Sequence, residues 1–222
     1  MKNKKIIVVA AITVIIVTVI AFALVSCSKK DEVKNNDGTT ATTTNDVGEV
    51  KDIDGFIIFK GQVVDGRPGE WGTWYNRDSK KPEKEIKEDG TGFIYDKNGN
   101  VIYEGQFKNQ KQEGQGKQYY NVNNEKTIGY EGQYKNGKKD GLGKWYMDTQ
   151  YNFIGVQLDF KTNSLFFEGT FKDDIARFGS FYYEDSKKLL EVDEVGNATF
   201  YDRNGSTKTG IYTPETEKFA QK

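Results

Sequence analysis

The sequence predicts an all-β protein, an elongated antiparallel β-meander made of β-hairpins in series. Its 222 residues include 24 glycines, 13 tyrosines and 14 phenylalanines but only three prolines, a composition that favours short strands and tight turns over helices. Glycines and aromatic residues recur together at similar spacings over much of the chain. No segment after residue 27 has the apolar periodicity of an amphipathic helix. Together these observations predict a chain of hairpins behind a signal segment and a disordered tether.

The first 26 residues are predicted to be a signal peptide. Three lysines near the N-terminus precede an apolar run of 20 residues, 6–25, which is the order found in secretion signals. The run ends in Leu24-Val25-Ser26-Cys27, which resembles the lipobox of bacterial lipoproteins. The resemblance implies cleavage before Cys27, a lipid anchor on Cys27 and an extracytoplasmic location at the cell membrane or outer envelope. An uncleaved signal anchor is the alternative, because the run is long enough to span a bilayer.

Residues 27–50 are predicted to be the lipidated cysteine followed by a flexible polar tether. Almost no residue from Ser28 to Glu49 is apolar, so this segment cannot bury enough surface to offset the entropy of ordering. Cleavage before Cys27 removes three lysines and no acidic residue, which leaves 29 basic against 33 acidic side chains. This mild acidity argues against nucleic acid as a partner.

The repeat domain is predicted to span residues 51–218. Segments that start at Tyr103 and Tyr130 align without gaps, a third copy starts at Phe167, and a weaker one starts at Phe59. A ring, a glycine and a second ring occupy alternate positions, and Gly-x-Gly follows in the best copies. The expected repeat-motif positions are Tyr103, Gly105, Phe107, Gly114, Gly116, Tyr130, Gly132, Tyr134, Gly141, Gly143, Phe167, Gly169 and Phe171.

This pattern resembles the MORN repeat family, over roughly residues 55–185. The resemblance implies a series of β-hairpins and, as in other MORN proteins, membrane attachment and contact with other proteins. Successive copies start 44, 27 and 37 residues apart, whereas the family has a steady period. We therefore expect an irregular array in place of a uniform solenoid, held together by packing between neighbouring copies.

The copy at Tyr130 shows how such a hairpin is expected to form. Alternation places Tyr130, Gly132 and Tyr134 on one face of a strand. Asn136-Gly137 is the preferred pair for a two-residue type I′ turn. Counting back from that turn pairs Lys135 with Lys138, Gly132 with Gly141, and Tyr130 with Gly143. The Tyr130 ring would then cover a residue that has no side chain, which compensates for the weakness of glycine in a strand.

The chain offers little chemistry for catalysis. It has no histidine and one cysteine, which excludes Ser-His-Asp and Cys-His catalysis, His-ligated zinc and an internal disulfide. Glu70 beside Trp71 and Trp74 is the best candidate for a glycosidase carboxylate, but a strand-end glutamate with two packed rings explains it better. The Asp96 and Asp202 loops have the glycine too early for an EF-hand and are better explained as Asx turns. We expect no metal and no cofactor.

Adjacent aromatic pairs give the sharper hypothesis about binding. Neighbouring strand residues face opposite ways, so one ring of each pair is expected to pack within the sheet. The other ring either forms an exposed ladder, for a glycan or a protein partner, or covers its own sheet. The candidate binding aromatics are Trp74, Tyr75, Tyr119, Tyr120, Trp145 and Tyr146.

The sequence therefore predicts a non-catalytic, membrane-anchored envelope lipoprotein whose repeats bind or scaffold a protein partner. One alternative is a module that binds cell-wall or other polysaccharides through exposed aromatics. Another alternative is a carboxylate-based glycoside hydrolase.

Overall fold

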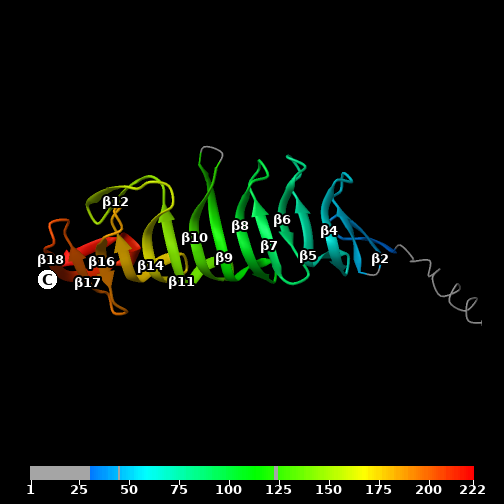
Figure 1. Cartoon of the computed structure of the whole chain (residues 1–222). Helices are drawn as coiled ribbons and strands as arrows, with labels where there is room; N and C mark the ends of the chain where they lie inside the picture. The colour runs from blue at the N-terminus through cyan, green and yellow to red at the C-terminus, as the bar shows by residue number, and fades with distance from the viewer. Residues whose placement is uncertain (1–30, 45, 123–124) are drawn as a thin grey trace, which may run out of the picture.

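The computed structural model describes residues 31–44, 46–122 and 125–222 of the chain (Figure 1). The predicted signal peptide and Cys27 lie outside the described residues. Within these ranges, no helix is long and apolar enough to cross a membrane. The one helical segment among them is a 3-10 turn, Pro214–Thr216.

The predicted antiparallel meander is confirmed. Each strand pairs with the next along the chain, except that the separate hairpin β12–β13 is inserted between β11 and β14. The molecule is elongated, with the strands across its long axis (Figure 1). The strands are β1 (Asp31–Lys34), β2 (Thr40–Thr44), β3 (Val47–Lys51), β4 (Ile57–Val64), β5 (Arg67–Tyr75), β6 (Pro82–Ile86), β7 (Thr91–Tyr95), β8 (Val101–Lys108), β9 (Lys111–Val122), β10 (Glu125–Lys135), β11 (Lys138–Met147), β12 (Gln150–Phe153), β13 (Val156–Asp159), β14 (Ser164–Lys172), β15 (Ile175–Tyr182), β16 (Lys188–Val192), β17 (Asn197–Tyr201), β18 (Thr207–Thr213) and β19 (Lys218–Gln221).

The prediction of a flexible tether is wrong for the described part of residues 31–50. This segment forms β1, β2 and β3, and β3 pairs with β4. Ala41 and Val50 are fully buried with Phe59 of β4. Two small apolar residues are enough to order this segment, because the neighbouring strand β4 supplies the Phe59 ring that packs on them. Only one face of β2 and β3 has to be covered. The threonines and valines around them are β-branched, which suits strands.

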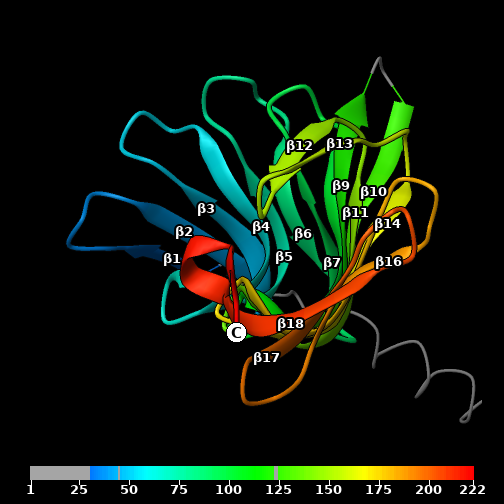
Figure 2. The same ribbon diagram turned by 90° about the vertical axis from the view of Figure 1, so that its left-hand side faces the viewer.

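The core lies on one face of the sheet, which we call the inner face. The six rings of the repeat motif, at positions 103, 107, 130, 134, 167 and 171, are all buried there. They meet edge to face: the centroid of Tyr130 lies 5.3 Å from that of Tyr134 and 5.0 Å from that of Phe171. Near the C-terminal end, the β12–β13 hairpin covers this face through Phe153 and Leu158. The end-on view shows the successive hairpins fanning out around the long axis (Figure 2), as expected for twisted strands.

The predicted register of the Tyr130 hairpin is correct at its turn and wrong beyond it. Lys135 does face Lys138, but Gly132 faces Gly143, because β11 contains a bulge of extra residues around Gly141. Tyr130 consequently lies opposite Trp145. Its ring still covers Gly143: a Cβ at that position would lie 2.4 Å from the Tyr130 hydroxyl.

The bulges align the glycines of successive strands in one row. Glycine faces glycine across eight strand pairs of the sheet. The resulting glycine row consists of Gly48, Gly61, Gly72, Gly92, Gly105, Gly116, Gly132, Gly143, Gly169 and Gly179, with Ile86 of β6 between Gly72 and Gly92.

Candidate binding face

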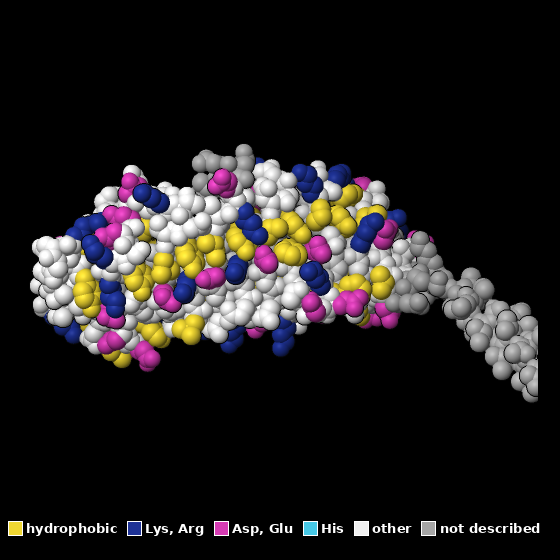
Figure 3. All heavy atoms as spheres, viewed as in Figure 1, with side chains coloured by type: hydrophobic (Ala, Val, Ile, Leu, Met, Phe, Trp, Pro, Cys, Tyr) yellow, Lys and Arg dark blue, Asp and Glu magenta, His cyan; other side chains and the backbone are white. Residues whose placement is uncertain are grey.

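The outer face of the sheet carries a straight row of side chains directly beside the glycine row. Residues next to the row glycines, before the glycine on one strand and after it on the next, face one another from strand to strand. Five of them alternate in sign. We call this set the charged row: Glu104, Lys117, Glu131, Lys144 and Glu168, on β8, β9, β10, β11 and β14. A row of alternating Lys and Glu side chains next to a band of hydrophobic side chains is visible along the molecule (Figure 3).

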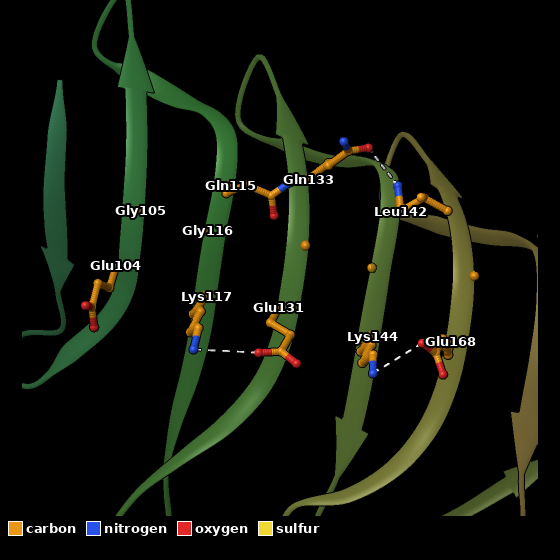
Figure 4. Close-up of a pocket in the computed structure, with 13 residues that line it drawn as sticks. Glu104, Gly105, Gln115, Gly116, Lys117, Glu131, Gln133, Leu142, Lys144 and Glu168 are labelled. Atoms are coloured by element: carbon orange, nitrogen blue, oxygen red, sulfur yellow. Dashed lines mark hydrogen bonds and ion pairs between the residues drawn. The ribbon is translucent and has the colours of Figure 1, made fainter.

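Neighbouring members of the charged row form ion pairs across the strands. The Lys117 Nζ lies 3.7 Å from a carboxylate oxygen of Glu131, and the Lys144 Nζ lies 3.2 Å from one of Glu168 (Figure 4). All four side chains are about one-third to one-half exposed, so each pair contributes only about 0–1 kcal/mol to stability. These polar groups are therefore held in place but remain open to a ligand.

A shallow groove runs along the glycine row. The charged row borders one side, and bulge residues including Gln115, Gln133 and Leu142 border the other (Figure 4). The groove is open to solvent, has a volume of about 570 Å³ and is floored by glycine backbone. Leu142 is 66% exposed and gives this border an apolar side chain that a ligand can reach. A flat, partly apolar floor with polar borders suits an extended ligand better than a compact one.

A second row on the outer face consists of tyrosines at equivalent positions of six hairpins. On every second strand a tyrosine stands three residues after the residue in line with the glycine row, which is a glycine on five strands and Ala198 on β17. We call these residues the tyrosine ladder: Tyr75, Tyr95, Tyr119, Tyr146, Tyr182 and Tyr201. All six side chains are partly exposed. They occupy β5, β7, β9, β11, β15 and β17.

Four ladder tyrosines donate hydrogen bonds to glutamates of the preceding strand. The Tyr146 hydroxyl lies 2.7 Å from Glu131 and the Tyr119 hydroxyl 3.2 Å from Glu104. The same bond joins Tyr95 to Glu85 at 3.2 Å and Tyr201 to Glu191 at 3.0 Å. Because the same bond recurs in four hairpins, the face repeats a ring beside a carboxylate, and at Glu104, Glu131 and Glu191 a lysine ammonium group lies next to the carboxylate.

The ladder tyrosines that bond to glutamates have raised pKa values. Burial raises the pKa of Tyr146, and its hydrogen bond to Glu131 raises that pKa further. Burial and the negative charge of Glu104 likewise raise the pKa of Tyr119. At Tyr201 the bond to Glu191 is the main cause of a raised pKa. These hydroxyls therefore act as donors throughout the physiological pH range.

The structure divides the six predicted binding aromatics between the two faces. Trp74 and Trp145 pack against the inner core, whereas Tyr75, Tyr119 and Tyr146 belong to the ladder. The Tyr119–Tyr120 pair is shifted by one residue relative to Trp145–Tyr146. Trp145 faces Tyr130 on one side, but on the other side Gln118, not Tyr119, faces Tyr130. Tyr120 therefore lies on the inner face over Gly129, where it is 40% exposed.

Sequence reasoning missed the other three ladder members. Tyr95, Tyr182 and Tyr201 stand in partial copies of the repeat, but they follow residues 92, 179 and 198 by the same three positions as Tyr146 follows Gly143. The spacing from the glycine-row position was the available signal. It also missed the glutamines that follow Gly105 and Gly132: the Gln106 and Gln133 side chains accept bonds from the bulge N–H groups of Gln115 and Leu142, at 2.7 and 2.9 Å.

The residues considered for glycosidase chemistry and for calcium binding have structural roles. Glu70 is exposed on β5, and its N–H donates to Gln62 at 2.9 Å, while Trp71 and Trp74 pack against the core. Asp96 accepts bonds from the N–H groups of Asn98 and Asn100, which makes an Asx turn. Among the described residues, no group of three or more acidic, histidine or cysteine side chains could hold a metal ion.

Comparison with known proteins adds no relative from which to transfer a function. No protein-family model matches the chain, and a search of the curated proteins gives no match.

Proposed function

We propose that this chain is a non-catalytic binding protein of the bacterial envelope, anchored in the membrane through lipid on Cys27. The outer face of its sheet is the binding surface. The single observation that carries the proposal is the repetition of the same tyrosine–glutamate pair in four hairpins, because a solvent-facing arrangement repeated along a molecule suits an extended ligand. The MORN resemblance is part of this proposal, since binding and membrane attachment are what it implies.

Two kinds of ligand were left open by the sequence, a polysaccharide and a protein. The ladder favours the polysaccharide, because a tyrosine ring beside a carboxylate and an ammonium group provides stacking, an acceptor and a donor for sugar hydroxyls. A protein partner is the second candidate. It is favoured by Leu142, which projects beside the groove and is largely exposed, as interface anchors often are before binding.

Binding is tested by crosslinking on intact cells. A photo-crosslinking amino acid at Leu142, beside the groove, should capture an envelope polysaccharide or protein. The same amino acid at Ile53, which is 78% exposed in a turn, is the matched control and should capture much less. Equal labelling from both positions contradicts the proposed face.

The anchor is tested separately by changing Cys27 to alanine. Lipid chains contribute about 0.8 kcal/mol per buried methylene, so their loss should release the processed protein from membranes. Metabolic labelling with a fatty acid should mark the wild type and not the variant. An unprocessed variant that stays in the membrane, together with an unlabelled wild type, would contradict lipidation and favour the signal anchor.

A further inference from the structure

We infer that the ligand is a linear, uncharged polysaccharide that lies along the outer face, with one two-sugar unit on each pair of strands. This inference builds on the proposed binding function and names the class of ligand. It depends on three properties of the ladder and the charged row: their period, their chemistry and their charge.

The period of the ladder matches a two-sugar unit. Its tyrosines stand on every second strand, from β5 to β17, and neighbouring strands are about 4.7–4.9 Å apart. Successive tyrosines are therefore about 9–10 Å apart along the sheet. That is comparable to the length of two sugars in an extended β-linked chain. Each two-sugar unit would meet an equivalent set of groups.

Polypeptide ligands do not keep this register. Side chains on one face of an extended peptide recur about every 6.6–6.8 Å, and those on one face of a helix about every 5.4 Å. Consecutive side chains of either ligand would therefore not meet consecutive ladder tyrosines, which are about 9–10 Å apart. An added strand is also excluded along this face, because the backbone groups of the sheet's interior strands are already paired with their neighbours.

The central part of the outer face offers the groups that sugar hydroxyls need. In the central unit, Tyr146 donates to one oxygen of Glu131 at 2.7 Å, and Lys117 lies 3.7 Å from the other oxygen. These contacts orient the carboxylate and leave it further lone pairs to accept from hydroxyl groups. The partly exposed ring of Tyr146 provides an apolar surface, and the glycine floor of the groove lets the ligand approach the backbone.

The alternating charges select against a charged polymer. Along the charged row each carboxylate has an ammonium group on a neighbouring strand, so the row has almost no net charge over any two strands. A polyanion would meet Glu104, Glu131 and Glu168 at every second strand, and a polycation would meet the lysines between them. A neutral chain meets neither repulsion.

The test measures binding by the full chain in detergent micelles to soluble chito- and cello-oligosaccharides of two, four and six sugars. Several weak contacts in series make affinity rise with ligand length, so we expect at least one of the two series to bind about tenfold more tightly at six sugars than at two. Hyaluronan, a linear polyanion, is the charged comparison and should bind more weakly than the neutral hexamer.

Variants connect the affinity to the ladder. Tyr146→Ala and the near-isosteric Glu131→Gln should each weaken binding of the six-sugar ligand several-fold. Tyr120→Ala removes a tyrosine of the neighbouring repeat from the inner face and should leave binding unchanged. Circular dichroism verifies that the variants are folded. If Tyr146→Ala fails to fold, Glu131→Gln still tests the inference, because position 131 lies on the surface and glutamine is tolerated there.

The outcomes separate the inference from the proposed function. Equal affinity for two and six sugars, tighter binding of hyaluronan, or unchanged binding by Glu131→Gln overturns the inference and leaves a binding protein of another specificity. Failure of both sugar series while the Leu142 crosslink captures a protein overturns the inference in favour of a protein ligand. Failure of the sugars together with non-selective crosslinking overturns both proposals.

Discussion

A tyrosine ring over a glycine pair is the residue-scale unit of this molecule. The Tyr130 hydroxyl donates to the carbonyl of Gln133 at 3.0 Å, and Tyr103 makes the equivalent bond to Gln106 at 3.0 Å. The ring can lie flat against the sheet only because the facing positions have no side chain. The glycines are therefore required by the packing of the ring, and the ring shields the strand backbone that glycine leaves exposed.

Gly143→Ala should destabilise the protein by about 1–3 kcal/mol, the usual cost of overpacking. A Cβ at this position would lie 2.4 Å from the Tyr130 hydroxyl and 2.6 Å from the ring, so the ring must move. Urea unfolding measures the loss. In a Tyr130→Ala background the same change should cost much less, and a cost that is equal in both backgrounds would show that the ring is not the cause.

Tyr134→Phe should leave stability unchanged or raise it by up to about 1 kcal/mol. The Tyr134 hydroxyl is buried and has no hydrogen-bond partner among the described residues, while Phe107 and Phe171 fill the equivalent positions. Tyr130→Phe is the matched comparison and should cost about 1 kcal/mol, because it removes a formed bond. A larger loss for Tyr134→Phe than for Tyr130→Phe would contradict this assignment.

At the scale of elements, the hairpins are closed by recurring five-residue turns. Asp96 and Asp193 each accept hydrogen bonds from the backbone N–H groups two and four residues later. Each also accepts one from the side chain of the residue four positions later, Asn100 or Asn197. The glycine of each turn has a positive φ, 91° at Gly99 and 84° at Gly196. The turns are thus set by an aspartate carboxylate and a glycine conformation, which are local properties of the sequence.

These turns predict that stability falls in acid. The hydrogen bond from Asn100 lowers the pKa of Asp96, and that from Asn197 lowers the pKa of Asp193, each below the ordinary 3.8. A carboxyl with a lowered pKa in the folded state stabilises the fold above its ordinary pKa and loses this effect as pH falls through the lowered value. The urea midpoint should therefore decrease below about pH 4.

The double variant Asp96→Asn, Asp193→Asn tests the origin of that decrease. Asparagine keeps an acceptor oxygen at each turn but does not titrate, so the variant's urea midpoint should depend less steeply on pH between 5 and 2.5. Parallel pH profiles for the variant and the wild type would assign the acid sensitivity to other carboxyl groups.

At the scale of the whole molecule, the long sheet has two hydrophobic cores. A small one near the N-terminal end consists of Ala41, Val50, Phe59 and Val63, and a large one extends from Ile86 to Tyr212. Trp74 packs against both. Because each hairpin contacts mainly its neighbours, stability should depend on local packing, as in repeat proteins. The same linear arrangement repeats the outer-face groups along the molecule.

Leu190→Ala and Val50→Ala should each destabilise the core in which the residue lies, at opposite ends of the molecule. Leu190 is fully buried, so its truncation should cost about 2–5 kcal/mol and speed amide hydrogen exchange mainly in β14–β17. Val50→Ala should speed exchange mainly in β2–β5. A uniform change along the chain in either variant would indicate a single cooperative unit instead.

The sequence by itself determined the class of fold and the contents of each face. Alternation within strands placed the motif rings on one face and the charges on the other, because side chains of a strand alternate with a period of two. The Asn136-Gly137 turn and the pairing of Lys135 with Lys138 also followed from local chemistry. The same period revealed that only one ring of a pair such as Trp145 and Tyr146 would face outward.

The tertiary structure decided the register away from the turns, the order of residues 31–50 and the alignment of the outer face. The bulge at Gly141 shifts the pairing by two residues, and a turn cannot determine pairing beyond such a bulge. β2 and β3 are ordered because Phe59 covers Ala41 and Val50, which no property of the polar segment itself reveals. The tyrosine ladder exists only after eleven strands, β5–β11 and β14–β17, are in register, since it joins residues that are neighbours in space and distant in the chain.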